Sequence, residues 1–258
     1  MGRQSMVVVA HPDDETIGLG GHLADFADLT IVHVTDGAPR DMQDARAHGF
    51  AERSAYAQAR RRELTAAVAE VGIDPCALLC LGIIDQETPL CLAALSRRLA
   101  ALFLRRRPLA VFTHAYEGGH PDHDAAAFAA RAAIRLIAAQ GESAPALIET
   151  PLYHGENGRV VTQTFAPTPP VKGFTAPLGR RAAAMKRAML AHFHTQRQVL
   201  AQFQTDVERF RLAPDYDFTE LPNGGDLYYE RFPWGLDGAS WRKRAGAALA
   251  ELGLPSCR

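Results

Sequence analysis

The sequence predicts a Rossmann-like, doubly wound α/β fold, with a mostly parallel sheet and a smaller C-terminal extension. Two observations lead to this prediction. Short apolar runs alternate with helix-like stretches between residues 6 and 150, a pattern typical of parallel strands joined by right-handed crossover helices. The chain has 258 residues, of which 47% are hydrophobic, so it is long and apolar enough to bury a sizeable core.

The core strands are expected where apolar runs are followed by turn or polar residues. These runs span 6–10, 29–35, 77–81, 109–113 and 146–150, and the helix-like stretches between them span 15–27, 54–71, 92–106 and 122–139. Gly72 and Pro108 predict the ends of the second and third helices, because glycine favours a helix C-terminus and proline cannot continue a helix.

After Pro151 the regular alternation stops. We expect a strand at 160–165, a helix at 178–203 and a late strand at 226–232. The whole chain, 1–258, is expected to form one domain, in which a Rossmann-like core over 1–150 carries a helical and β extension over 151–258 that completes the functional site.

Composition narrows the class of protein. The net charge is −1, which gives no electrostatic reason to expect nucleic acid or an anionic membrane as a partner. No signal peptide and no membrane anchor are expected, because a long apolar run is missing. The four cysteines form no C-x-x-C pair, as in a cytoplasmic protein with reduced thiols. The sequence leaves open whether the chain forms a homo-oligomer.

Two short motifs stand out, A-H-P-D-D-E at 10–15 and H-P-D-H at 120–123. Each lies just after an expected strand and just before an expected helix. Ligands of open parallel sheets bind beyond the carboxyl ends of the strands, so we expect the two motifs to meet there. A single His-Pro-Asp turn of this kind is usually a helix N-cap, but two of them together favour a metal site.

The residue types in these motifs indicate zinc chemistry. His11, Asp14 and His123 supply two imidazoles and one carboxylate, the ligand set of a catalytic zinc site with an open fourth position. The same set also suits Fe²⁺. We expect Asp13 to take the proton of an attacking water, and His120 to donate to the oxyanion or to the leaving amine.

A supporting residue is expected next to His120. Asp122 is predicted to orient that imidazole from behind. His192, on the late helix, is expected at the rim of the site. Gly20 and Gly21 favour close packing of the first helix rather than NAD binding, since a full G-x-G-x-x-G is missing.

The two motifs together closely resemble those of the PIG-L/LmbE-like de-N-acetylase family. Further segments resemble that family: Gly18, Gly20 and Gly21 after the first motif, Thr35-Asp36-Gly37, Arg60 with Glu63-Leu64, Lys186 with His192 and Gln196, and Glu230-Arg231-Phe232. The resemblance implies a zinc-dependent amidase, with an N-acetylated amino sugar or sugar conjugate as its small-molecule substrate.

Carried over residue by residue, the resemblance places the ligands at His11, Asp14 and His123, the general base at Asp13 and the second catalytic histidine at His120. It also implies that Arg60 faces the substrate. One departure is Gly118, where some members have a tyrosine that contacts the oxyanion. Tyr116 is a nearby substitute.

Two rival functions remain open on the sequence alone. A non-haem Fe(II) enzyme would use the same three ligands, although Asp13 is a feature that hydrolysis needs and oxygen chemistry does not. A non-catalytic sugar-binding relative would be expected to have lost part of the catalytic set. The sequence predicts neither the identity of the substrate nor that of the acyl group.

Overall fold

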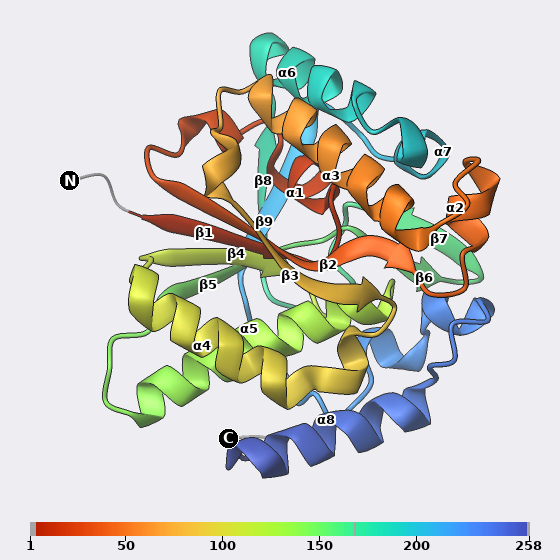
Figure 1. Ribbon diagram of the computed structural model, residues 1–258. Helices are drawn as coiled ribbons and strands as arrows, with labels where there is room; N and C mark the ends of the chain where they lie inside the picture. Colours follow the sequence, from red (N-terminus) through yellow and green to blue (C-terminus); the bar gives the residue numbers. More distant parts are fainter. Residues whose placement is uncertain (1–3, 168, 257–258) are drawn as a thin grey trace.

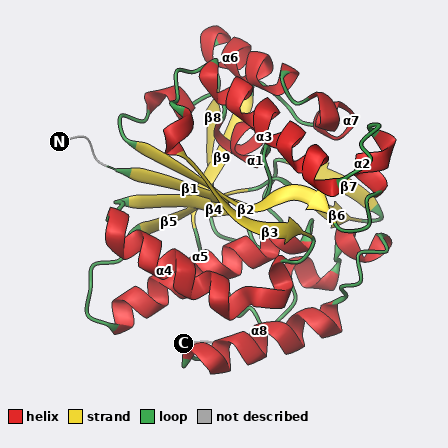
Figure 2. Cartoon of the chain, viewed as in Figure 1, coloured by secondary structure: helices red, strands yellow, loops and turns green. Residues whose placement is uncertain are grey.

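A seven-stranded sheet forms the centre of the molecule in the computed structural model, which describes residues 4–167 and 169–256. Its order is β3-β2-β1-β4-β5-β9-β8 (Figures 1 and 2). Five strands are parallel: β1 (Ser5–Val9), β2 (Leu29–Pro39), β3 (Leu78–Asp85), β4 (Ala110–His114) and β5 (Ala146–Thr150). β9 (Val207–Leu212) pairs antiparallel with β5, and β8 (Phe174–Pro177) pairs antiparallel with β9. The predicted fold class is confirmed.

Helices cover both faces of this sheet (Figure 1). One face carries α1 (Asp14–Leu19), α3 (Arg53–Ala69), α6 (Arg180–Ala191) and α7 (Arg197–Leu200), and the other carries α4 (Leu92–Arg106), α5 (Pro121–Ala139) and α8 (Gly238–Leu252). The short helix α2 (Gln43–Ala47) and the hairpin β6 (Tyr153–Glu156)–β7 (Arg159–Thr162) lie beyond the carboxyl ends of the strands. No helix in the described ranges is long and apolar enough to span a membrane.

The central strands are buried on both faces, which explains their unbroken apolar sequences. In β1, Val7 and Val9 belong to the core beneath α1, α3 and α6, whereas Met6 and Val8 belong to the core beneath α4, α5 and α8. β9 and β8, from the segment after 151, continue this same sheet. We infer from this continuity that the chain is one domain.

β3 is an edge strand of the sheet, and two arginines satisfy its outer carbonyls. Arg61 Nη2 donates to the carbonyl of Leu78 at 3.2 Å, and Arg98 Nη1 donates to that of Leu81 at 2.8 Å. The edge therefore offers fewer free acceptors than a bare strand would.

The expected helix over 15–27 is wrong in length. α1 ends at Leu19, and a 3-10 turn follows over Leu23–Asp25. A Cβ on Gly21 would lie 2.4 Å from Cδ1 of Leu178. The two glycines are thus needed for close packing of α1, as expected, but they also end it.

The extension differs more from the prediction. The strand expected over 226–232 is wrong, because this segment forms irregular chain and a 3-10 turn over Tyr228–Arg231. The helix expected over 178–203 is divided into α6 and α7 by a 3-10 turn over His194–Gln196. α8, β8 and β9 were not predicted, since their sequences are short or carry many polar residues whose burial depends on distant elements.

Candidate active site

Two segments at the carboxyl edge of the sheet form the candidate site. Residues 10–15 connect β1 to α1, and residues 120–123 open α5 after β4. Since β1 and β4 are parallel neighbours, both segments leave the sheet at the same edge. They line a cavity of about 160 Å³. The predicted site residues that meet in this cavity are His11, Asp13, Asp14, Arg60, His120 and His123.

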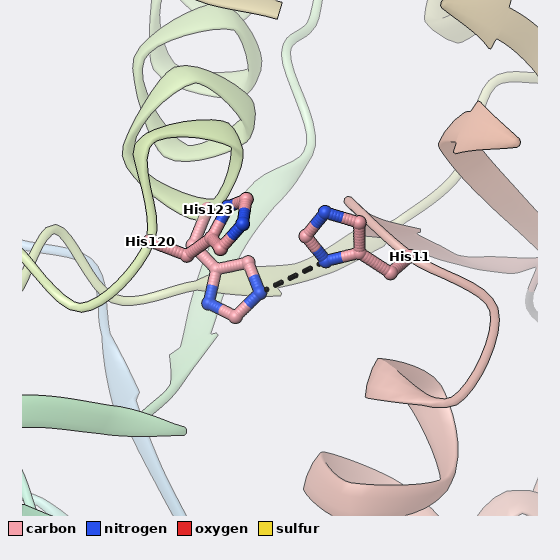
Figure 3. A group of neighbouring side chains, drawn as sticks. All are labelled: His11, His120 and His123. Carbon is pink, nitrogen blue, oxygen red and sulfur yellow. Dashed lines mark hydrogen bonds between the residues drawn. The ribbon is translucent and has the colours of Figure 1, made fainter. Parts of the chain in front are cut away.

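The three predicted metal ligands converge on one point. His11 Nδ1 lies 3.2 Å from His123 Nε2 (Figure 3). Asp14 Oδ2 lies 3.3 Å from His11 Nδ1, and Asp14 Oδ1 lies 3.4 Å from His123 Nε2. Bonds of about 2.0–2.1 Å arranged tetrahedrally around zinc place neighbouring ligand atoms about 3.3–3.4 Å apart. The spacing of these side chains therefore fits an ion of that size.

The electrostatics around the two histidines also suit a cation. Burial lowers the pKa of His123 to about 3, so its imidazole is neutral near pH 7. Burial also disfavours the charged form of His11, but the carboxylates of Asp85 and Asp14 outweigh this effect, and the pKa of His11 lies well above its usual value. The same negative charge that favours a proton on His11 would favour a divalent cation.

A grouping that includes His114 fits a metal less well. Asp14, His114 and His123 also converge. However, His114 Nε2 accepts a hydrogen bond from the N–H of Ala10 at 2.8 Å, so that nitrogen has no lone pair left for a metal. The ring of His114 stacks on His123 instead, with centroids 4.1 Å apart, and supports it from behind.

Asp13 adopts a backbone conformation that is rare outside glycine, with φ near +140°. Its N–H donates to Glu15 Oε2 at 3.0 Å, and Glu15 Oε2 in turn lies 3.0 Å from His33 Nε2. Such a conformation costs on the order of 1–3 kcal/mol and persists only where the surroundings hold it. Here it places the Asp13 carboxylate on the cavity wall while Asp14 faces the histidines.

Arg60, on α3, lines the cavity as expected, but its contacts differ from the expectation. Its Nη1 donates to the carbonyl of Gly37 at 2.8 Å, and its Nη2 donates to the carbonyl of Pro12 at 2.9 Å and to Asp13 Oδ2 at 3.0 Å. Burial raises the pKa of Asp13, and the Arg60 guanidinium opposes this rise. Arg60 therefore positions Asp13 and its turn through both Nη groups, whereas its buried Nε has no hydrogen-bond partner among the described residues.

The expected role of Asp122 needs a correction. Its carboxylate accepts from the N–H groups of Gln86 at 2.6 Å and Thr88 at 3.0 Å, and it lies 3.3 Å from His11 Nε2. It supports His11 rather than His120, because α5 directs its side chain toward the loop after β3. The N–H of Asp122 donates to His120 Nδ1 at 3.1 Å. This bond assigns the proton of neutral His120 to Nε2.

His120 lies on the cavity wall beside His11, with ring centroids 4.5 Å apart (Figure 3). Burial lowers the pKa of His120 well below its usual value. A neutral imidazole with its proton on Nε2 is a hydrogen-bond donor, which matches the function expected of this residue.

Sequence reasoning missed Asp85, the last residue of β3. Its Oδ1 lies 3.0 Å from His11 Nε2 and 3.9 Å from His120 Nε2, and it lines the cavity. The signal was available, because Asp85 follows a strand at the same carboxyl edge as both motifs. The expected end of that strand at residue 81 concealed it.

Two aromatic residues of the extension were also missed. Tyr153 and Trp234 line the cavity, and their rings lie 5.4 Å from that of His123 and 4.6 Å from that of His120, respectively. Tyr116, the nearby substitute for a tyrosine at Gly118, instead donates its hydroxyl to the carbonyl of Glu220 at 2.9 Å, on the far side of the sheet core. Tyr153 is the tyrosine that the structure places at the cavity.

His192 does not join this group. Its Nε2 lies 2.7 Å from Glu70 Oε1 in a partly exposed ion pair between α6 and the end of α3. The residues that line the cavity include Gln196 rather than His192. The rim position expected for His192 is therefore wrong, because α6 ends at Ala191 and the chain turns there.

A model of the GlcNAc-PI de-N-acetylase (PIG-L) family matches residues 6–134, which is half of the chain. The chain belongs to this family. The matched range contains both motifs and all three converging ligand side chains, whereas Tyr153 and Trp234 lie beyond it. No curated protein matches the chain.

Solved structures share the fold of this PIG-L member. The A40926 pseudoaglycone deacetylase Dbv21 is 21% identical, with a TM-score of 0.60 over 78% of this chain and 85% of that one. N,N'-diacetylchitobiose deacetylase from Pyrococcus horikoshii is 17% identical, with a TM-score of 0.58 over 83% and 84%. The 4-carboxy-2-hydroxymuconate hydratase GalB from Pseudomonas putida is 19% identical, with a TM-score of 0.57 over 77% and 82%. Because one of the three is a hydratase, the reaction has to be argued from the site itself.

Proposed function

We propose that this PIG-L family member is a metal-dependent hydrolase that removes an N-acyl group, most simply acetyl, from an amino sugar or sugar conjugate. One observation carries the proposal. His11, Asp14 and His123 converge with ligand atoms 3.2–3.4 Å apart, and a separate carboxylate, Asp13, lines the same cavity. We propose Zn²⁺ as the metal, with Fe²⁺ as the alternative.

These three side chains would hold the ion, which when bound would polarise the amide carbonyl and acidify a water molecule. Asp13 would accept the proton of the attacking water at its carboxylate, held in place by Arg60. His120 would donate a hydrogen bond from Nε2 to the developing oxyanion. The C–N bond then breaks, the amine leaves with a proton returned from Asp13, and the acyl group leaves as a carboxylic acid, which releases its remaining proton to solvent at neutral pH.

Tyr153 is a second candidate donor to the oxyanion. Burial raises the pKa of its phenol well above the usual value, so the hydroxyl keeps its proton at all pH values of interest. Asp85 and Asp122 would hold the His11 ring in place by accepting a hydrogen bond from its Nε2, which leaves Nδ1 to the metal.

We further propose that the partner of this site is a small molecule, in a protein located in the cytoplasm. The near-neutral net charge of −1 supports a small molecule rather than nucleic acid as the partner. Whether copies of the chain associate is a separate question for a measurement of mass in solution.

Asp13 and Asp14 provide the sharpest test of this function. The metal-loaded protein is incubated with a panel of N-acetylated sugars and conjugates, and free amine is measured. Asp13→Ala should lose activity by about 10²–10⁴-fold while keeping its metal, whereas Asp14→Ala should lose both. A metal-free Asp13→Ala with a metal-replete Asp14→Ala would reverse the two roles, and full activity of both would refute the site.

Metal analysis with an oxygen-uptake assay separates the Fe(II) alternative. A hydrolase should release amine without consuming oxygen, and this should hold for every metal ion that restores activity. Oxygen consumption that depends on His11 and His123 would favour the rival.

A further inference from the structure

A second hollow adjoins the proposed metal cavity. It has a volume of about 280 Å³ and is lined from the loop after β3, from Arg40 and from the segment around Trp234. Asp85, Gln86 and Trp234 line both spaces, so the two lie side by side. This hollow is called the side groove below.

The metal cavity is small on its own. Its volume of about 160 Å³ is below the 300–1,000 Å³ typical of sites for drug-sized ligands, whereas the cavity and the side groove together fall within that range. A substrate that fills both spaces is larger than one acylated sugar. Its acylamino end would lie in the metal cavity and its second part in the side groove.

One part of the side groove is apolar. Leu90, which is 57% exposed, lines this part together with Pro89, Pro233 and Leu236. Trp234 forms the wall shared with the metal cavity, and its other side stacks on Phe232 with ring centroids 4.5 Å apart. These side chains would gain from burial against an apolar group.

The charges of the side groove argue against an anionic group. Among the described residues that line it, Arg40 is the only cation, and it already forms a two-pronged ion pair with Glu87 at 2.5 and 3.0 Å. Asp41 and Asp85 contribute further negative charge. A phosphate there would find no unpaired cation and would face repulsion.

We propose that the side groove binds a neutral, largely apolar aglycone, aryl or alkyl, that is attached to the acylated amino sugar. The proposal rests on the proposed deacetylase function and names the class of its substrate. The aglycone is not the leaving group when the amide is cleaved. Its effect on rate therefore reports binding rather than reactivity.

The test compares N-acetylglucosamine, its p-nitrophenyl glycoside and its 1-phosphate. Amine release gives kcat/KM, and calorimetry gives Kd for each compound. The aryl glycoside should have a kcat/KM roughly 10- to 100-fold higher and a Kd roughly 10- to 100-fold lower than the free sugar, and the 1-phosphate should show neither gain. The aryl advantage is the ratio of kcat/KM for the aryl glycoside to that for the free sugar, and Leu90→Glu should bring this ratio close to one. Leu109→Glu, at a leucine that is 53% exposed before β4, is the matched control and should leave the advantage intact.

The outcomes separate the two proposals. Amine release without an aryl advantage, or an advantage that survives Leu90→Glu, would overturn the aglycone site while the deacetylase function stands. Aryl-selective binding that is lost in Leu90→Glu without any amine release would support the aglycone site and refute the function. Preference for the 1-phosphate would replace the neutral aglycone with an anionic one, and no binding of any compound would overturn the aglycone site.

Discussion

Arg60→Ala tests whether this arginine positions the general base or contacts the substrate. The substitution removes three hydrogen bonds, to Gly37, Pro12 and Asp13, from a side chain that is 4% exposed. It also leaves the Asp13 carboxylate, which is 7% exposed, without its cation. Breaking a buried ion pair by removing one partner costs about 3–5 kcal/mol.

That loss is a large part of the 5–15 kcal/mol by which domains are usually stable, and it corresponds to a fall in Tm of roughly 10 °C. Because Asp13 would lose its fixed position, kcat should fall by about 100-fold or more, with KM little changed. Thermal unfolding and steady-state kinetics at saturating metal measure the two effects. Arg62→Ala, on the exposed side of α3, should match the wild type in both.

The opposite kinetic pattern would refute this reasoning. If Arg60→Ala unfolds like the wild type and raises KM without lowering kcat, the guanidinium binds substrate and its contacts with the turn are incidental. Arg60→Lys is informative as well, since lysine keeps the charge but cannot make three bonds in the geometry of a planar guanidinium, and it should recover only part of the loss.

Three further predictions follow from buried contacts. Lys186→Met removes the buried ion pair with Glu208, whose carboxylate keeps only its contacts with His22 and the N–H of Gly21, and should lower the free energy of unfolding by about 3–5 kcal/mol in denaturant titrations. Adding Glu208→Gln should restore most of this loss, and an unchanged single variant would contradict the prediction. Gly119→Ala places a Cβ 1.9 Å from the carbonyl oxygen of Tyr153, so activity should fall more than about tenfold at unchanged metal content; wild-type kinetics would contradict this. Burial raises the pKa of Glu149 to about 7, so the folded state binds this proton more tightly than the unfolded state. Stability should therefore fall by up to about 3 kcal/mol as pH rises from about 4.5 to 7, and Glu149→Gln should remove that part of the pH dependence; equal slopes would contradict it.

The parts of the fold that the sequence predicted are those in which local pattern and burial agree. β1 and β4 are largely apolar runs. β1 leads directly into the first motif and β4 reaches the second after residues 115–119, so one rule about the carboxyl ends of parallel strands brought His11 and His123 together. The two glycines after α1 were interpreted correctly as a packing requirement. Their effect on the length of α1 was not.

What the sequence could not predict depends on partners that are distant along the chain. Arg60 was assigned to the substrate because no pattern shows that its donors reach Gly37 and Pro12. Trp234 lies in irregular chain, where periodicity carries no information, and only the folded chain places it beside His120.

The two arginines on the outer edge of β3 bear on how copies of this chain can meet. A second sheet pairing with β3 would need the carbonyls of Leu78 and Leu81, which Arg61 and Arg98 already occupy. Edge-to-edge pairing of two sheets through β3 therefore starts with the loss of two hydrogen bonds. If the chain forms a homo-oligomer, its interface is more readily built from helix surfaces than by extending the sheet through β3.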